Sequence, residues 1–249
     1  MIQKIEELSM NALPALSTML VNGWVLRFAN GYSKRANSVN PIYPCSVEVE
    51  RNIEICDGLF KRNNLDTVFK LTEMEDAYRI DEILGEMGYS YEAKTNIMLK
   101  SIEKYSIKEE DKRDVILYRE LRDDWFEAFV GMNKIGPQHG PTLQKMLKSI
   151  IPDTYYGCIV ENGKITAVGL GVAERGYVGM YDICVAQEQR RRGLGTKIMK
   201  NLIHKASEDG YTYSYLQVVD ANEAAKLLYD NLGYEKKYSY WYRVKKFHK

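Results

Sequence analysis

The stretch AQEQRRRGLGTKIMK, residues 186–200, most constrains how this chain can fold. It follows a β-rich run, YVGMYDICV, and continues as helix-forming sequence to about Ser207. Gly193 and Gly195 lack side chains, so the backbone N–H groups beside them can turn toward an anion and approach it closely. A helix that begins there adds its unpaired N–H groups and its positive end. The pattern predicts a strand, a turn and a helix that together hold an anionic group.

Several anions are compatible with a turn rich in arginine, because guanidinium groups donate charge-assisted hydrogen bonds to phosphates. A dinucleotide site requires a third glycine in a βαβ unit, and here that glycine is missing and the preceding strands form antiparallel hairpins. A nucleic-acid backbone is disfavoured, because Lys plus Arg number 35 against 34 Asp plus Glu, a net charge of +1. The pyrophosphate of a coenzyme remains, beside the alternative of a solvated loop that binds nothing.

Composition narrows the class of protein further. No apolar run approaches the roughly 18 residues that span a bilayer, and the first residues lack the pattern of a secretion signal. The four cysteines show no C-x-x-C spacing, so we expect no metal site and no disulfide framework. Free thiols without a secretion signal indicate a cytoplasmic protein. We expect no nucleic-acid or membrane partner, and the oligomeric state stays open.

Apolar alternation and Asn-Gly pairs predict the secondary structure. Two hairpins are expected, at residues 23–39 around Asn30-Gly31 and at residues 155–173 around Asn162-Gly163. The remaining expected strands are 67–71, 91–102, 177–185, 212–219 and 234–244. The expected helices are 46–63, 76–87, 119–132, 142–150, 193–207 and 223–231.

The two halves of the chain repeat one order of elements. ILGEMGY ends at Tyr89 and LYDNLGY ends at Tyr234, each with a strand before the helix, a glycine that caps it and a strand after it. The charged segment 101–114 separates the halves. We therefore predict two domains, residues 1–105 and 106–249.

In the second half, two groups of residues carry a resemblance to a known family. The first is Arg190-Arg191-Arg192-Gly193-Leu194-Gly195, after a strand that ends at Val185, and the second is Asp220-Ala221-Asn222, Ala225, Leu228-Tyr229 and Leu232-Gly233-Tyr234. Together they resemble the signature of the GNAT superfamily of N-acetyltransferases, over about residues 110–249. The resemblance implies an α+β fold: a mixed, mostly antiparallel sheet flanked by helices, here as a tandem pair of such domains.

The resemblance also implies an activity and its site. A GNAT enzyme transfers an acetyl group from acetyl-CoA to a primary amine, on a small molecule or a peptide, by direct attack in a ternary complex. A non-catalytic protein that binds acyl-CoA as a sensor is the alternative. In the family's pattern, the backbone at Ile183, Cys184 and Val185 pairs with the pantetheine arm. The pyrophosphate is held by Arg190, Arg191, Arg192, Gly193, Leu194, Gly195 and Thr196. Asn222 and Ala225 line the other side of the arm, and Tyr229 donates a proton to the departing thiolate.

The general base does not follow from the resemblance. Family members often carry a glutamate six residues before the valine that ends the strand, and that position here is Gly179, which has no titratable group. Glu174 and Asp182 are the nearby carboxylates, either of which an ordered water could connect to the amine. Strand alternation puts Asp182 on the face opposite Ile183, which favours Glu174. The loop residue His139 is a further candidate.

The first half lacks the Gly-x-Gly turn. VNPIYPCSVEVE, residues 39–50, stands in its place with two prolines and acidic side chains that would repel a pyrophosphate. This half is therefore expected to be a degenerate GNAT-like domain without a CoA loop. Its polar run around Tyr32–Asn40 is either a solvated edge strand or, with Trp24, a wall of the acceptor pocket.

Overall fold

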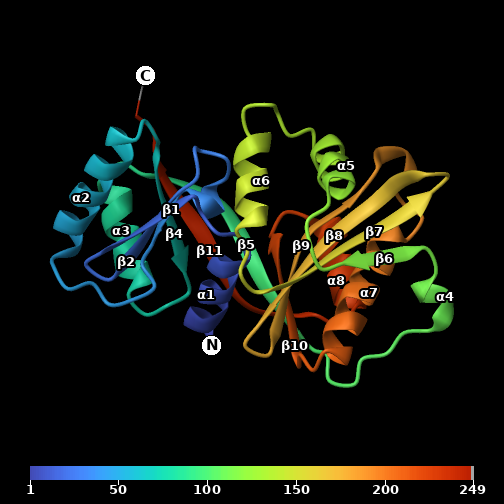
Figure 1. Cartoon of the computed structure of the whole chain (residues 1–249). Coiled ribbons are helices and arrows are strands. Elements are labelled where there is room, and N and C mark those ends of the chain that lie inside the picture. The colour runs from blue at the N-terminus through green and yellow to red at the C-terminus, as the bar shows by residue number, and fades with distance from the viewer. Residues whose placement is uncertain (248–249) are drawn as a thin grey trace. The chain divides into compact units, whose positions relative to one another are not determined.

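The computed structural model describes residues 1–247 and divides into two compact units (Figure 1). Unit 1 comprises Met1–Asn96, the short segment Val219–Ala221, and residues 238–247. Unit 2 comprises Ile97–Val218 and Asn222–Lys237. The predicted boundary at residue 105 therefore differs from the observed division, which also returns the end of the chain to unit 1.

Unit 2 contains the second of the two repeats. Its elements are the end of β5 (Ser90–Ser101), α4 (Glu109–Lys112), β6 (Val115–Tyr118), α5 (Asp123–Asn133), α6 (Gly140–Lys148), β7 (Asp153–Glu161), β8 (Lys164–Glu174), β9 (Tyr177–Val185), the short 3-10 helix η2 (Gln187–Gln189), α7 (Leu194–Glu208), β10 (Tyr213–Val219), α8 (Glu223–Asn231) and the start of β11 (Glu235–Lys245). The strand order is β5-β10-β9-β8-β7-β6. The pairs β6–β7, β7–β8 and β8–β9 are antiparallel, whereas β9–β10 is parallel.

Helices cover both faces of this sheet. Successive side chains of a strand point to opposite faces, and the neighbours Tyr155 and Tyr156 show this on β7. Tyr155 belongs to the cluster that α7 covers. Tyr156 lies edge-on against Trp125 of α5, with ring centroids 5.1 Å apart. The indole of Trp125 also donates a hydrogen bond of 2.8 Å to the carbonyl of Gly157, which ties α5 to its face.

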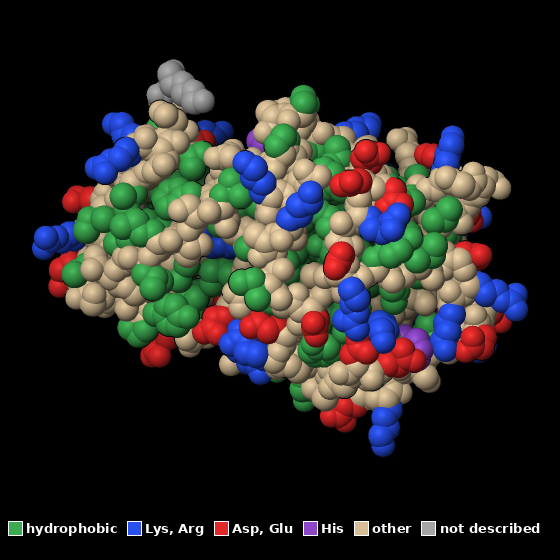
Figure 2. All heavy atoms as spheres, in the orientation of Figure 1, with side chains coloured by type: hydrophobic (Ala, Val, Ile, Leu, Met, Phe, Trp, Pro, Cys, Tyr) green, Lys and Arg blue, Asp and Glu red, His purple; other side chains and the backbone are tan. Residues whose placement is uncertain are grey.

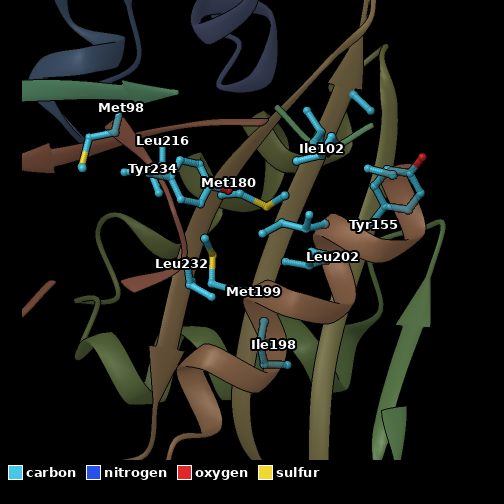
Figure 3. Close-up of a cluster of buried hydrophobic side chains, with 14 of the residues drawn as sticks. Met98, Ile102, Tyr155, Met180, Ile198, Met199, Leu202, Leu216, Leu232 and Tyr234 are labelled. Carbon is cyan, nitrogen blue, oxygen red and sulfur yellow. The ribbon is translucent and has the colours of Figure 1, made fainter. Parts of the chain in front are cut away.

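The core between the sheet and α7 is apolar and closely packed (Figure 3). Ile198, Met199 and Leu202 repeat at helical spacing on α7 and are fully buried against the sheet. Around them lie Met98, Ile102, Tyr155, Met180, Leu216, Leu232 and Tyr234 from strands and connecting segments of this unit. Truncating a leucine in such a core typically costs about 2–5 kcal/mol, so this packing positions the start of α7 firmly.

Unit 1 has the same order of elements around its own core. These are α1 (Ile2–Ala12), β1 (Ser17–Val21), β2 (Trp24–Phe28), the short 3-10 helix η1 (Lys34–Ala36), β3 (Ser38–Asn40), α2 (Val49–Arg62), β4 (Thr67–Thr72), α3 (Ala77–Glu86), most of β5 and the end of β11. The strand order is β1-β2-β3-β4-β11-β5, with β3–β4 parallel. A hairpin, a strand, a helix, a strand and a helix thus recur in both units, as the sequence predicts.

The end of β11 shows a connection that sequence order alone does not indicate. Its residues Tyr240–Lys245 pair antiparallel with Thr67–Thr72 of β4, inside unit 1. Arg243 of β11 donates two hydrogen bonds of 2.7 Å to the carboxylate of Asp81 on α3. Trp241 donates a third hydrogen bond, of 2.6 Å, to the same carboxylate. Strand β11 therefore begins in unit 2 and completes the sheet of unit 1.

A buried ion pair anchors the N-terminal helix within unit 1. Glu6 of α1 is fully buried and accepts hydrogen bonds from the ammonium of Lys70 on β4 and, at 2.8 Å, from the hydroxyl of Tyr238. The charge of Glu6 is thus compensated inside the unit, as a buried carboxylate requires.

Three expectations about secondary structure need correction. The first hairpin turns on Asn22-Gly23 between β1 and β2, and the turn at Asn30-Gly31 belongs instead to the longer loop before β3. Helix α1 and strands β1 and β6 were not expected from the sequence. Helix α5 begins at Asp123 rather than near residue 119, because residues 115–118 form β6.

Candidate functional site

Strands β9 and β10 separate part of the way along unit 2. Their parallel register runs from Tyr213 opposite Tyr177 to Leu216 opposite Met180 and ends there. Beyond Met180, β9 continues to Val185, paired with β8 on its other edge. Because a strand edge without a neighbour presents its N–H and C=O groups, this segment can bind an extended chain in the manner of an added strand.

A bulge in β9 explains the separation. Cys184 lies opposite Val168 and Tyr181 opposite Leu170, so Asp182 and Ile183 together face the single residue Gly169. Asp182 has a φ of +54°. A bulge of this kind bends its strand and increases the local twist, which carries the end of β9 away from β10.

The turn after β9 leaves the N-terminus of α7 open. Gly193 precedes the helix with a φ of +78°, and a side chain built on it would meet nothing within 4 Å. No side chain caps this terminus and its first turn carries no acidic residue. By contrast, the start of α8 is capped by Asn222, whose Oδ1 accepts a 3.1 Å hydrogen bond from the N–H of Ala225. The first N–H groups of α7 are therefore available to an anion.

The three arginines of this turn differ in their contacts. Arg192 donates to both carboxylate oxygens of Glu161, at 2.8 and 3.0 Å, and to the side chain of Gln189. The Nε of Arg190 lies 3.4 Å from the carbonyl of Val185, which it contacts as a donor. Arg191 is exposed and has a φ of +66°, a conformation that is unusual for a bulky side chain. Arg192 thus links the turn to the end of β7, and Arg191 projects into solvent.

Helix α8 borders the same region. Ile183 and Val185 of β9 and Ala225 and Tyr229 of α8 are partly buried against one apolar cluster, to which Leu194 at the start of α7 belongs. The fold therefore brings the strand end and the helix start beside the second motif, whose Ala225 follows Leu194 by 31 residues in the sequence. Asn222 holds the first turn of α8 through its capping bond.

Tyr229 is partly buried and retains its proton. Its ring packs edge-on against Tyr234, with centroids 6.2 Å apart. Burial raises the pKa of Tyr229 above its ordinary value of about 10. Within the described part of the chain its hydroxyl has no hydrogen-bond partner. A protonated phenol in this position is able to donate to a leaving group.

Glu174 and Asp182 are the two candidate carboxylates for the base, and the register of β8 on β9 places them at different points along the hairpin. Glu174 lies opposite Tyr177 and forms an ion pair of 3.2 Å with Arg175. Eight residues of extended strand, about 26 Å, separate Tyr177 from Val185. Glu174 thus lies at the end of the β8–β9 hairpin opposite the open turn, and this placement does not support the role expected for it.

Asp182 lies at the bulge itself. Tyr156 packs against Trp125 of α5. Burial first and then the charge of Asp182 raise the pKa of Tyr156, so the carboxylate of Asp182 is felt on this face of the sheet. Cys184 shares this face, and burial is the largest of the influences that raise the pKa of its thiol. A thiol with a raised pKa is a poor nucleophile, so the side chain of Cys184 is not suited to covalent catalysis. His139 lies at the start of α6, partly buried.

The position of the missing glutamate is filled by two tyrosines that the sequence analysis did not identify. A Cβ on Gly179 would lie 2.6 Å from the ring of Tyr181 and 2.6 Å from the hydroxyl of Tyr215. The two hydroxyls are 2.8 Å apart and buried. Tyr181 lies two residues after Gly179 on the same face, and this spacing is the signal from which the contact could have been inferred.

The corresponding turn of unit 1 has different chemistry. Residues 41–48 and the start of α3 enclose a cavity of about 510 Å³ whose lining includes Glu48, Glu75 and Asp76. Glu48 occupies the position before α2 that Gly193 occupies before α7. Negative charge at this terminus disfavours the binding of an anion.

Charge on the visible surface is mixed. Figure 2 shows Lys and Arg side chains interspersed with Asp and Glu over the face in view, without a large area of one sign. No helix within residues 1–247 is long and apolar enough to cross a bilayer. In the same residues, no group of three or more His, Cys, Asp or Glu side chains is arranged to hold a metal ion.

The bulged strand, the open helix terminus and the flanking helix define the GCN5-related N-acetyltransferase class. The family model described as "Probable histone acetyltransferase Rv0428c C-terminal" matches residues 1–243, and the chain belongs to this family. It is thus an acyl-CoA-dependent acetyltransferase of the GNAT superfamily, as the sequence motifs indicated.

Individual relatives agree with this assignment. An uncharacterized N-acetyltransferase of Bacillus subtilis, YobR, is 24% identical over 98% of this chain and 99% of its own. The ribosomal protein bS18-alanine N-acetyltransferase of Escherichia coli K12 is 29% identical over 30% of this chain and 51% of its own length. A GCN5-related N-acetyltransferase structure from Kribbella flavida, 16% identical, aligns with a TM-score of 0.73 over 99% of this chain and 96% of that chain. The structure of a tandem GNAT protein from the clavulanic acid biosynthesis pathway, 10% identical, aligns with a TM-score of 0.63 over 78% of this chain and 68% of that chain.

Proposed function

We propose that this protein transfers an acetyl group from acetyl-CoA to a primary amine. One observation carries the proposal: the unpaired end of β9 leads directly to the uncapped N-terminus of α7. An extended arm that ends in a pyrophosphate needs these two features in this order. Alternating N–H and C=O groups suit the amides of pantetheine, and helix N–H groups suit phosphate oxygens.

The residues of the site divide between the parts of acetyl-CoA. The backbone of Ile183, Cys184 and Val185 pairs with the pantetheine arm, and Asn222 and Ala225 of α8 border its other side. The pyrophosphate takes the N–H groups of Gly193, Leu194, Gly195 and Thr196, with Arg190 and Arg191 as charged donors. Arg192 is not counted among these donors, because the carboxylate of Glu161 already accepts two hydrogen bonds from its guanidinium.

The chemistry assigned to this site is one acyl transfer in a ternary complex. The amine nitrogen forms a bond to the thioester carbonyl carbon, and the carbon–sulfur bond breaks. The proton that the amine loses passes, directly or through one water, to the carboxylate of Asp182. Tyr229 gives its proton to the departing thiolate; Asp182 then releases a proton to solvent and Tyr229 regains one. The products are the N-acetylated amine and free CoA. We assign the base to Asp182 in place of Glu174 because Asp182 lies at the bulge and Glu174 at the far end of the hairpin.

Calorimetric titration with acetyl-CoA tests the proposal. Wild-type protein is expected to bind in the micromolar range and Gly193→Asp to lose binding, because a carboxylate in front of α7 repels the pyrophosphate. Gly193→Asn is the matched control, since asparagine accepts a positive φ and adds no charge. Absence of binding to the wild-type protein would refute the proposal.

A second function shares the same site: an acyl-CoA sensor that binds without turnover. The filling of the Gly179 position by Tyr181 and Tyr215 is the observation that favours it. Release of free CoA thiol in the presence of a panel of amines, from small polyamines to peptides, decides between the two. Turnover with any acceptor supports the enzyme, whereas binding without thiol release across the panel supports the sensor.

A further inference from the structure

Strand β1 is an edge strand that lacks the usual protection against pairing. It stands at the end of the strand order of unit 1, and its outer edge is paired with no strand in the described residues. Met19 is 46% exposed and Leu20 is 69% exposed. Natural edge strands carry charges, prolines or bulges that block pairing, and β1 has none of them.

The distribution of charge makes this absence distinctive. Charged residues make up 28% of the chain, yet none occurs between Glu7 and Arg27. The strand at the end of the order in unit 2, β6, is flanked directly by Asp114 and Arg119. Strand β6 therefore has a charged residue at each end, whereas β1 is neutral over its whole length.

The hairpin geometry identifies which backbone groups face outward. Asn22 and Gly23 have φ values of +49° and +94° and form a two-residue turn closed by Val21 and Trp24. The closing pair of such a turn is hydrogen-bonded, and bonded pairs alternate along the strands. Met19 therefore bonds to β2, while Thr18 and Leu20 direct their N–H and C=O groups to the free edge.

We propose that a second copy of this chain pairs its β1 antiparallel with this β1, about a two-fold axis at Met19. This register uses all five residues of β1. Thr18 pairs with Leu20 of the second copy and Leu20 with Thr18 of the second copy, which forms four backbone hydrogen bonds. The two Met19 side chains face each other at the axis, and Leu20 packs beside the methyl group of Thr18.

A second copy is the occupant that these features favour. A strand that meets its own copy about a two-fold axis makes an isologous contact, which closes after two chains. Identical charged strands would place like charges opposite one another, a cost that this neutral segment avoids. Pairing β1 with β6 of another copy would be head-to-tail, would produce open chains, and would set exposed apolar residues beside the charged flanks of β6.

The first test is the oligomeric state by sedimentation equilibrium at tens of micromolar protein. Wild type is expected to be dimeric. Met19→Lys sets two ammonium groups against each other and is expected to raise the dimer dissociation constant about tenfold or more. Ile151→Lys, which changes a 96% exposed residue of unit 2, is the matched control and is expected to leave the dimer intact. A monomeric wild type, open polymers, or a dimer insensitive to Met19→Lys would overturn the proposal.

The second test fixes the register by cysteine cross-linking. Directly opposed residues of a non-bonded antiparallel pair have Cα atoms about 4.5 Å apart, within the range of a disulfide. Met19→Cys is therefore expected to form a cross-linked dimer on mild oxidation. Leu20→Cys, whose copies lie on a diagonal at about 7–8 Å, is expected to cross-link far more slowly. Wild type controls for the native thiols, and equal rates for the two variants would contradict the register. Binding of acetyl-CoA by each variant, measured separately, distinguishes this interface from the CoA site.

Discussion

Arg192 and Glu161 form a bidentate ion pair, with N–O distances of 2.8 and 3.0 Å, between the predicted pyrophosphate turn and the end of β7. The sequence motif assigned this arginine to the coenzyme, but in the structure a carboxylate already occupies it. The pair is partly exposed, so its contribution to stability is small, about 0–1 kcal/mol. Its main effect is to place a negative charge beside the proposed pyrophosphate site.

Glu161→Gln is therefore expected to tighten acetyl-CoA binding about two- to fivefold, because it removes that charge and releases Arg192. The gain should shrink as salt is added, since the contact is solvent-exposed. Calorimetric titration at low and high ionic strength measures both effects. Glu188→Gln, also beside the turn but without an arginine to release, is the control. Weaker binding by Glu161→Gln would show that the pair serves instead to order the turn.

Gly169→Ala is expected to lower the free energy of unfolding by about 1–3 kcal/mol. The added Cβ would lie 2.5 Å from Cγ2 of Ile198 and 2.7 Å from Cδ1 of Ile183, so α7 or the bulge must shift. Urea unfolding measures the change. Gly131→Ala, on α5, meets no atom within 4 Å and is expected to stabilise the protein slightly, by about 0.5–1 kcal/mol. Equal stabilities for the two variants would argue against the close approach at Gly169.

Tyr229→Phe is expected to lower kcat about a hundredfold and to leave acetyl-CoA affinity unchanged, because only the proton donor is lost. Burial raises the pKa of Tyr229 above its ordinary value of about 10, so the phenol is protonated at neutral pH. The wild-type rate should then show no alkaline decline from this residue below about pH 10. In the unfolded chain this phenol ionises near pH 10, so its burial leaves stability unchanged below that pH and lowers the free energy of unfolding as the pH rises further. A pH–rate profile of both proteins provides the test, and an unchanged kcat would exclude the assignment.

Asp182→Asn is expected to reduce kcat about a hundredfold, whereas Glu174→Gln should remain close to wild type. Asparagine tolerates the φ of +54° at this position, so the bulge is retained while the proton acceptor is removed. Steady-state rates at saturating acetyl-CoA compare the two variants. The reverse ranking would return the base to Glu174 and remove Asp182 from the mechanism.

Asp81→Asn is expected to destabilise the protein by about 2 kcal/mol, because Arg243 and Trp241 lose a charged acceptor. Burial by itself raises the pKa of Asp81, but hydrogen bonds from Arg243 and Trp241 and the charge of Arg243 lower it overall. With a lowered folded pKa, the stabilisation is present above the unfolded value of about 3.9 and is lost as the pH falls through the folded value. Thermal unfolding between pH 7 and pH 3 should show the wild type approach the variant at the acid end. A constant difference across that range would contradict this account.

Much of the site follows from local sequence. Neighbouring residues determine the strand that ends at Val185, the glycine turn and the helix after it. Their backbone preferences and spacing can be recognised in the sequence without knowledge of the fold. The second motif, from Asn222 to Tyr234, is predicted for the same reason, and so is the acidic turn of the first half. The first hairpin turns at Asn22-Gly23, whereas the sequence analysis places that turn at Asn30-Gly31, the other Asn-Gly pair of this region.

Other parts depend on contacts between distant segments. The choice of Asp182 rather than Glu174 as the proposed base depends on the register of β8 on β9. A bulge shifts that register, and no distinct local sequence pattern predicts it. The space at Gly179 is filled by Tyr215, from a different strand. Neither follows from helix or strand propensity, because each depends on which strand lies beside which.

By itself, then, the sequence predicted the two repeats and the glycine turn before α7, since these are set by residues close together in the chain. The tertiary structure alone decided that β11 leaves the repeat in which it begins and pairs with β4, that Arg192 is held by Glu161, and that β1 is left as a neutral edge. The physical reason is common to all three. Strand pairing and ion pairing join residues far apart in sequence, and their partners are selected by packing of the whole unit rather than by local preference.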